Sequence, residues 1–408
     1  MKVLFLAHVL PYPITDGMRS TCFQILRHIS QRHETTLLVL SEFEEDKKYI
    51  PEVSKWCPRV EIIHSPIPRS PFRRLKNVFF EKDPYCVRQF YSPAYEQKLK
   101  QLIKEERFDV VHLLSVNVSA YAHCLRNIPT LFFPHDSVSM QFYRNLQFEK
   151  NPLYRFYMHS QWKKMLNYEK KILPQFTQTV LVSEVDKDWI LKFCPQAKIS
   201  IIPAGVDCDY FTPEEKGTVP LGTVPFSPFS LEQPSVLFRG VMNFPPNRDA
   251  VLYFYHHILP LIKKQIPNLI FYIVGKDPPR EILKLHDGIH TFVTGLVPDL
   301  RPYIAGSTVN ICPLLSGSGI KNKILEAWAM EKPVVATSIA CGGIQIEHRK
   351  NILIADDAKT FAQSVTELIH KPELRYEIGK NGRELVKNQY SWENSISKFE
   401  EIYNKIKK

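Results

Sequence analysis

Short apolar runs alternate with helical patterns along most of the chain. In the first half, strands are predicted at residues 2–7, 35–40, 60–64, 109–114, 130–134, 179–183 and 199–203, with a helix near 19–32. In the second half, strands are predicted at 235–240, 269–275, 289–295, 309–313, 333–337 and 351–355. Continuous apolar strands separated by helices are typical of parallel sheets covered on both faces. The pattern therefore predicts an α/β chain with two doubly wound, Rossmann-like units.

A segment rich in Pro, Gly and Ser interrupts this alternation at residues 212–234. Such a composition does not sustain a helix or a central strand. We therefore expect an N-terminal domain at 1–205, a linker at 206–234 and a C-terminal domain at 235–389. Ligands of open parallel sheets bind beyond the carboxyl ends of the strands, so two such sheets facing each other would enclose one cleft. Residues 390–408 predict an amphipathic helix that packs back toward the N-terminal domain, with Trp392, Ile396, Phe399 and Tyr403 on one face.

The composition is that of an ordinary globular protein with a basic first half. Of the 408 residues, 44% are hydrophobic, and none of the eight cysteines forms a CxxC pair, which indicates a reducing compartment without a structural zinc site. The net charge is +11, and residues 1–200 carry 29 Lys and Arg against 20 Asp and Glu. Nucleic acid, an anionic membrane surface, an acidic substrate or a solvated basic face could each account for this excess.

The N-terminus and the lack of long apolar runs bear on the membrane question. No apolar run approaches the roughly 18 residues of a spanning helix, and MKVLFLAHVLPYP resembles a first strand rather than a signal peptide. Residues 66–80 hold four cations, no acid and interleaved apolar side chains. This pattern favours either contact with an anionic membrane surface or a basic helix whose apolar side lies in the core. We expect a cytoplasmic protein that binds peripherally at the inner membrane face.

The loop SGSGIKNKILEAWA, residues 316–329, follows a predicted strand and leads into a predicted helix. Gly317 and Gly319 allow the backbone to approach a ligand closely. The free N–H groups of a helix start, together with Lys321 and Lys323, suit a diphosphate. Glu326, about one turn further on, could accept hydrogen bonds from the hydroxyls of a ribose. A Gly/Ser turn before an ordinary surface helix is the alternative.

Several familiar site patterns are absent or poorly placed. Neither GxxxxGK[ST] nor a GxGxxG after the first strand is present, which disfavours a P-loop NTPase and a Rossmann dehydrogenase. Asp207-Cys208-Asp209 has a DxD form but does not follow a nucleotide-binding strand, so no metal role is expected. Asp186 and Asp188, two apart on a predicted helix, are interpreted as solvated surface residues. No signature of a nucleic-acid-binding module is found.

With the loop placed on a second α/β unit, the chain resembles the family 4 glycosyltransferases of the GT-B fold, in a bacterial exopolysaccharide-type branch. The resemblance rests on PYPITDGMRS (11–20), FPHDS (133–137), IIPAGVDCDYFTP (201–213) and CPLLSGSGIKNKILEAWAMEKPVVAT (312–337). It implies retaining transfer of a hexose from a UDP- or GDP-sugar to a glycan or lipid-linked acceptor, without a metal or a cofactor. It also implies that the donor binds mainly the C-terminal domain and the acceptor mainly the N-terminal one.

The resemblance assigns roles to individual residues. His135 would hydrogen-bond the transferred sugar, and Gly17 and Arg19 would contribute to anion binding after the first strand. The family usually has a second glutamate eight positions before Glu326, and Ser318 stands there instead. As a catalytic residue, Ser318 would hydrogen-bond the sugar, less strongly than a carboxylate does. An Arg and a Lys that the family often places after the first strand of the donor domain are replaced by Val241 and Asn247. The candidates for the missing charge are Lys321, Lys323, Arg239 and Arg248.

Two other classes of function remain open from the sequence. A nucleotide-sugar epimerase would share the two-domain fold. A non-catalytic basic protein that binds membrane or nucleic acid would retain a degenerate sugar site, for which Ser318 and the absent Arg/Lys pair would be the sign. We expect the donor sugar nucleotide and the acceptor to be the partners, with no nucleic acid bound.

Overall fold

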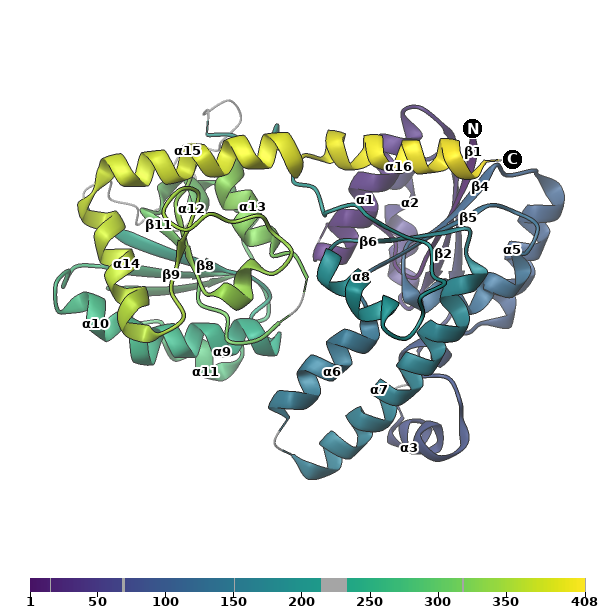
Figure 1. Cartoon of the computed structure of the whole chain (residues 1–408), viewed down its shortest axis with the longest axis horizontal. Helices are drawn as coiled ribbons and strands as arrows, with labels where there is room; N and C mark the ends of the chain where they lie inside the picture. The colour runs from purple at the N-terminus through teal and green to yellow at the C-terminus, as the bar shows by residue number, and fades with distance from the viewer. Residues whose placement is uncertain (15, 68–69, 150, 214–232, 318, 408) are drawn as a thin grey trace. The chain divides into compact units, whose positions relative to one another are not determined.

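The computed structural model describes residues 1–14, 16–67, 70–149, 151–213, 233–317 and 319–407 (Figure 1). The chain divides into two compact units. The N-terminal unit comprises Met1–Ala204 and Ser395–Lys408, and the C-terminal unit comprises Gly205–Asn394. Most of the predicted linker, from 214 to 232, lies outside the described residues.

The N-terminal unit is built on a seven-stranded sheet in which every neighbouring pair is parallel. Its strands are β1 (Lys2–Ala7), β2 (Glu34–Ser41), β3 (Arg59–His64), β4 (Val110–Leu113), β5 (Thr130–His135), β6 (Gln178–Leu181) and β7 (Ile199–Ile201). Their order across the sheet is β3-β2-β1-β4-β5-β6-β7. The helices are α1 (Gly17–Ser30), α2 (Ile50–Ser54), α3 (Pro71–Phe80), α4 (Tyr85–Arg88), α5 (Pro93–Glu105), α6 (Val138–Phe148), α7 (Pro152–Ile172) and α8 (Glu184–Leu191).

The C-terminal unit repeats the plan with a six-stranded parallel sheet of order β10-β9-β8-β11-β12-β13. Its strands are β8 (Ser235–Arg239), β9 (Ile270–Val274), β10 (Thr291–Gly295), β11 (Val309–Cys312), β12 (Val334–Ala336) and β13 (Leu353–Ile354). Its helices are α9 (Pro245–Tyr253), α10 (Leu259–Lys263), α11 (Arg280–Leu283), α12 (Arg301–Gly306), α13 (Asn322–Ala329), α14 (Ala358–His370) and α15 (Pro372–Gln389). The predicted fold class, two doubly wound Rossmann-like units, is confirmed.

Every strand predicted from the apolar runs is present, to within two residues at either end. The runs predict strands well because both faces of each sheet are covered, so the strands have no polar face. Caps mark several helix starts: the side chain of Asp16 accepts a hydrogen bond from the Arg19 amide at 3.0 Å, and Asp357 caps α14 in the same way.

The C-terminal helix α16 (Trp392–Ile406) buries the face predicted for it, with Trp392, Ile396, Phe399 and Tyr403 all inaccessible to solvent or nearly so. In the N-terminal unit, the Tyr403 hydroxyl lies 2.6 Å from Nδ1 of His112, which is fully buried on β4. His112 is therefore a packing residue. In the part of the chain that the structure describes, no helix is both long and apolar enough to span a bilayer.

Candidate active site

His135 ends β5 with a backbone conformation that side chains disfavour. Its φ is 72°, which is sparsely populated by residues other than Gly and is often found at functional sites. The ring packs on Phe133 at 4.2 Å and hydrogen-bonds the backbone of Leu114, while its buried Nε2 finds no partner among the described residues. Burial, helped by the nearby His8, lowers the pKa of His135 to about 4. A neutral imidazole with a free ring nitrogen therefore stands at the strand end.

His8 is a neighbour of His135 that the sequence analysis missed. It follows β1 directly, and β4 separates β1 from β5 in the sheet. Burial lowers the pKa of His8 to about 4, while Asp16 acts in the opposite direction. The signal was available, because a polar residue immediately after a buried strand lies at the edge where ligands of parallel sheets bind.

Arg19 lies in the first turn of α1, where its charge was predicted to bind an anion. The guanidinium donates to the backbone carbonyls of Leu10 and Tyr12, at 2.7 and 3.3 Å, and lies 3.8 Å from a carboxylate oxygen of Asp46. The structure therefore uses Arg19 to hold the loop after β1. Gly17 begins the helix, and a Cβ added there would meet open space. Anion binding by either residue stays a prediction.

The loop after His135 is fastened by buried carboxylates. Asp186 accepts a hydrogen bond from the Ser137 amide at 2.9 Å and another from the Ser183 hydroxyl, and it is almost fully buried. The interpretation of Asp186 as a solvated surface residue was wrong, since two apart on a helix still allows one residue to face inward; Asp188 is exposed as expected. Glu169 of α7 accepts a hydrogen bond from the Ser139 amide at 3.2 Å.

Burial raises the pKa of Glu169 to about 7, against the hydrogen bonds from Ser137 and Ser139, which lower it. The folded protein thus binds this proton more tightly than the unfolded chain does. The stability contributed by this group is present at acid pH and is lost as pH rises through about 7. We expect the free energy of unfolding of the wild type to fall by about 2 kcal/mol from pH 5 to 8, relative to Glu169→Gln. Urea titrations of both proteins at the two pH values would measure this difference. The same change in the free energy of unfolding with pH in both proteins would contradict the prediction.

In the C-terminal unit, Lys323 brings its charge to the end of β8. Its ammonium donates to Oδ1 of Asn247 at 2.8 Å and lies 4.2 Å from the ring centre of Phe238. Asn247 is the position where the resembled family has a lysine. Burial lowers the pKa of Lys323 to about 8, and Arg239 and Lys321 act in the same direction. The Lys323 ammonium on α13 therefore lies beside position 247 of α9, where the resembled family often has a lysine.

Arg239 and Glu326 form an ion pair that the sequence analysis did not anticipate. One guanidinium nitrogen of Arg239 contacts a carboxylate oxygen of Glu326, and the other donates to the carbonyl of Lys323 at 2.5 Å. The Arg239 side chain is 6% exposed and that of Glu326 is 21% exposed. Arg239 is thus committed to α13, whereas Glu326 keeps part of its surface accessible to a ligand.

The loop before α13 gathers the remaining candidates. The Lys321 ammonium donates to the carbonyl of Gly319 at 2.6 Å, and a Cβ on Gly317 would lie 3.7 Å from that ammonium. Among the described residues no side chain caps the start of α13, so amides of its first turn other than that of Ile324, which donates to the Lys321 carbonyl, are available to an anion. Ser318, predicted as a catalytic residue, lies outside the described residues. Arg248, by contrast, pairs with Asp249 and Glu281 on the surface of the unit.

Two glycines allow the backbone segments after β8 and β9 to pack closely against each other beside Lys323. A Cβ on Gly240, after β8, would lie 3.2 Å from the Lys323 ammonium and 2.7 Å from the Asn247 amide nitrogen. A Cβ on Gly275, after β9, would lie 1.8 Å from the carbonyl oxygen of Gly240. The bare backbone at 240 therefore makes room for the lysine, and the one at 275 makes room for Gly240.

Two sequence patterns prove to be located elsewhere. Asp207 of the DxD pattern accepts hydrogen bonds from the amides of Asp209 and Tyr210, at 3.2 and 2.9 Å, and so caps a turn. Of residues 66–80, positions 68 and 69 are outside the described residues, and 71–80 form α3. The alternative in which the apolar side of this helix lies in the core is wrong, since Phe72 is 84% exposed and Phe80 is 82% exposed.

Comparison with known proteins gives two matching family models. A model described as Glycosyltransferase Family 4 matches residues 15–210, and one described as Glycosyl transferases group 1 matches residues 233–371. The first match covers the strand end at His135, and the second covers both lysines and the Arg239–Glu326 pair.

Individual relatives agree with these matches. A GDP-mannose-dependent alpha-(1-6)-phosphatidylinositol monomannoside mannosyltransferase of Mycobacterium tuberculosis is 27% identical over 50% of this chain and 56% of its own length. The aligned regions span only about half the length of the curated relatives. Among solved structures, sucrose-phosphate synthase of Thermosynechococcus elongatus aligns with 99% of each chain, at 18% identity and a TM-score of 0.76. HepE of Anabaena in complex with UDP covers 99% of this chain and 100% of its own, at 15% identity and a TM-score of 0.68.

Proposed function

Because the chain belongs to the family 4 glycosyltransferases and has the GT-B fold, we propose that it transfers a hexose from a UDP- or GDP-sugar to a glycan or lipid-linked acceptor. The transfer retains the anomeric configuration and needs no metal. The observation that carries the proposal is the placement of the Lys323 ammonium beside Asn247, at the carboxyl end of β8. A charge in this place would serve little purpose for folding, because burying it costs free energy.

The donor diphosphate binds at the start of α13. Lys321 and Lys323 supply two positive charges, and the uncapped helix start supplies N–H groups. These groups do what a bound divalent cation does in other enzymes, namely neutralise the charge that develops on the leaving diphosphate. Glu326 accepts hydrogen bonds from the ribose hydroxyls. The UDP held by HepE and the GDP-mannose dependence of the mycobacterial relative support this class of donor.

His135 acts on the transferred sugar. Its Nδ1 side is occupied by the backbone of Leu114, so the free Nε2 can accept a hydrogen bond from a sugar hydroxyl. The pKa of about 4 keeps the ring neutral at physiological pH, which is the form that can accept. Ser318 is expected to hydrogen-bond the same sugar and stays a prediction.

Removing His135 should slow transfer without changing nucleotide binding. Loss of one hydrogen bond between neutral groups predicts about a tenfold fall in kcat/KM for His135→Ala, with unchanged affinity for the free nucleoside diphosphate. His135→Gln keeps a hydrogen-bond acceptor and should recover part of the loss. Steady-state kinetics and nucleotide titrations measure both quantities, with His256→Ala, on the exposed surface of the C-terminal unit, as the matched control. Equal kinetics of His135→Ala and wild type would remove His135 from the site.

The acceptor-side proposal is a glycan or lipid-linked glycan of an extracellular polysaccharide, assembled at the cytoplasmic face of a membrane. The mycobacterial relative, a phosphatidylinositol monomannoside mannosyltransferase, supports a lipid-linked acceptor.

Release of UDP or GDP from a panel of sugar nucleotides, with and without glycan and lipid-linked acceptors, tests the function. Acceptor-dependent release supports transfer. Conversion of the donor without an acceptor would instead identify an epimerase, and a protein that releases no nucleotide would be a binding protein.

A further inference from the structure

Helix α3 is attached to its unit by its polar side. Asn77 is fully buried, and its amide nitrogen donates to the carbonyl of Asp83 at 3.0 Å, while its amide oxygen accepts from Gln161 of α7 at 2.9 Å. The ammonium of Lys164 donates to the carbonyls of Asn77 and Val78. Amphipathic helices of globular proteins normally bury their apolar side, whereas α3 buries Asn77 and leaves both its aromatic and its basic side chains exposed.

The apolar side chains of α3 point away from the unit, and those of the first turns of α7 join them. Phe72, Phe79 and Phe80 of α3 are exposed, as are Leu153, which is 83% exposed, and Phe156 on α7. Single exposed apolar residues are ordinary, but a contiguous group of this size marks a contact with another molecule or with a membrane. We call the exposed side chains of Pro71–Phe80 and Pro152–Tyr157 the α3–α7 surface.

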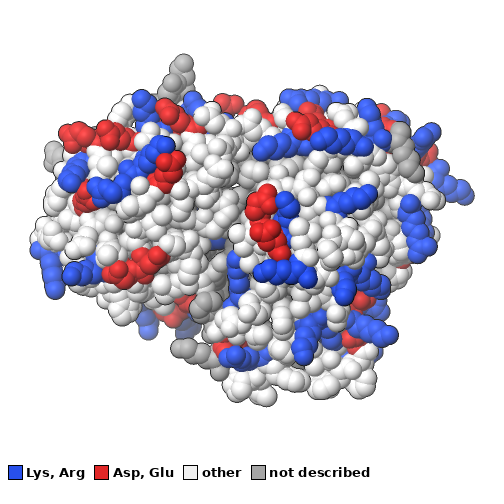
Figure 2. Space-filling view, viewed as in Figure 1, with Lys and Arg blue, Asp and Glu red and all other residues white. Residues whose placement is uncertain are grey.

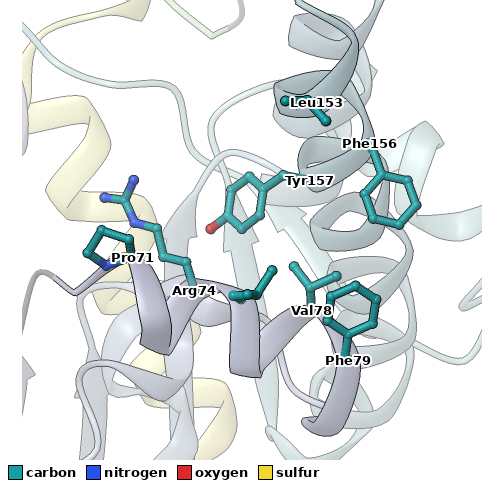
Figure 3. A pocket seen from close by; sticks show the side chains of 8 residues that line it. Pro71, Arg74, Val78, Phe79, Leu153, Phe156 and Tyr157 are labelled. Carbon is teal, nitrogen blue, oxygen red and sulfur yellow. The ribbon is translucent and has the colours of Figure 1, made fainter.

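A cavity of about 540 Å³ opens in this surface, between the two helices. Its volume falls within the range of small-molecule sites, roughly 300–1,000 Å³. Figure 3 shows the ring of Tyr157 between the side chains of Arg74 and Phe156, with Val78 and Phe79 on the α3 side. The remaining lining residues, Pro71, Leu75 and Leu153, are apolar. The lining suits a hydrocarbon chain with a negative group near Arg74.

The charged side chains of the two helix segments are all positive, although Glu81 follows α3 directly. Residues 71–80 and 151–165 contain six Lys and Arg and no Asp or Glu. Arg73, Arg74, Lys76 and Arg155 are exposed, and none of them forms an ion pair with another described residue. Figure 2 shows Lys and Arg side chains, and fewer Asp and Glu side chains, beside uncharged residues in the region where Figure 1 places α3 and the start of α7. The surface is therefore both apolar and positively charged.

We propose that the α3–α7 surface docks on an anionic lipid bilayer and that the cavity receives one lipid acyl chain. The exposed Phe and Leu side chains enter the acyl region, and the arginines and Lys76 lie at the phosphates. A second copy of the chain fits less well, because it would bring the four cations of this surface together with four more. Nucleic acid would use the cations but leave the apolar side chains in water.

The proposal does not depend on sugar transfer, so it is tested without donor or acceptor. The wild-type chain should sediment with vesicles of phosphatidylcholine and phosphatidylglycerol and much less with phosphatidylcholine alone. Salt should weaken binding, because the Debye length falls from about 10 Å at 0.1 M to about 3 Å at 1 M. Binding to both vesicle types alike, or to neither, would overturn the proposal.

Two variants separate the charged and apolar contributions. Arg73, Arg74, Lys76 and Arg155 changed together to Glu should lower the vesicle partition coefficient by roughly tenfold or more. Phe72, Phe80 and Leu153 changed together to Ser should lower it similarly while keeping every charge. The matched control changes four exposed cations outside α3 and α7, Lys104, Arg126, Lys192 and Lys198, to Glu and should bind nearly as the wild type does. All altered side chains are exposed, so thermal unfolding should be unchanged.

A tryptophan introduced at the cavity reports, by its fluorescence, whether the surface reaches the acyl chains of the bilayer. The fluorescence of Leu153→Trp should be quenched by vesicles whose acyl chains carry bromine. Absence of extra quenching relative to the wild type would overturn acyl-chain binding. Unreduced vesicle binding by both surface variants would overturn the proposal, as would a dimer that both variants abolish, since the surface would then belong to a second copy.

Discussion

Exchanging two residues, Asn247→Lys together with Lys323→Asn, should restore donor use that Lys323→Asn alone removes. The ammonium of Lys323 lies 2.8 Å from Oδ1 of Asn247, so a lysine at 247 would project its charge from α9 into the same place. A charged hydrogen bond is worth about 1.5–3 kcal/mol, which predicts a 10- to 100-fold loss of kcat/KM for the donor in Lys323→Asn or Lys323→Ala. Lys321→Ala should show a loss in the same range.

The exchange tests whether donor use requires a positive charge between positions 247 and 323, whichever of the two residues carries it. The matched control, Lys264→Asn, removes an exposed lysine of the same unit and should leave donor kinetics unchanged. The buried Lys323 has a pKa of about 8, so donor affinity of the wild type should decline as pH rises from 7 to 9.5, because the neutral amine attracts phosphate weakly. Wild-type kinetics in both Lys321→Ala and Lys323→Ala would assign the diphosphate to other residues, such as Arg248.

Glu326→Ala should damage both stability and nucleotide binding. It leaves the guanidinium of Arg239, which is 6% exposed, without its carboxylate. Removing one partner of a buried ion pair typically lowers the free energy of unfolding by about 3–5 kcal/mol. Because Glu326 is partly exposed, we expect a loss of about 3 kcal/mol. Affinity for UDP or GDP should fall in the order wild type, Glu326→Gln, Glu326→Ala. Urea unfolding and nucleotide titration measure the two effects.

A double variant separates these effects. Arg239→Met with Glu326→Leu replaces the pair by apolar side chains, which is often neutral or stabilising. We expect it to recover stability and to bind UDP and GDP as poorly as Glu326→Ala does. Wild-type affinity of Glu326→Ala for both nucleotides would show that this carboxylate does not bind the ribose, whatever its effect on stability.

The sequence predicts where the strands and the glycine-rich loop lie, but not which side chains of the site contact one another. The apolar runs place all the strands, and the loop 316–326 lies at the strand end where polar residues were sought. The sequence could not show that Lys323 reaches Asn247 or that Arg239 pairs with Glu326, because both contacts join residues 76 or more positions apart on separate elements. His8, by contrast, was predictable, because it directly follows β1 at the edge of the sheet where ligands bind.

The orientation of α3 and the burial of Asp186 were beyond the sequence for a different reason. The hydrophobic pattern of α3 shows two faces but not which one meets the protein, and only the hydrogen bonds of Asn77 with Gln161 decide that. Likewise, Asp186 is buried because the loop after β5 offers it the Ser137 amide, while Ser183, the N-cap of its own helix, donates a hydroxyl. Periodicity describes one element at a time, whereas these outcomes depend on what a second element presents.

The contact between Gly240 and Gly275 limits how this protein can be redesigned. With a Cβ at 275 only 1.8 Å from the carbonyl of Gly240, even alanine there would push the loop after β8 away from Lys323 and Asn247. Libraries that seek a new sugar or a new base should therefore hold both glycines fixed. Diversity is better placed at side chains whose volume can change without moving the backbone, such as Val241.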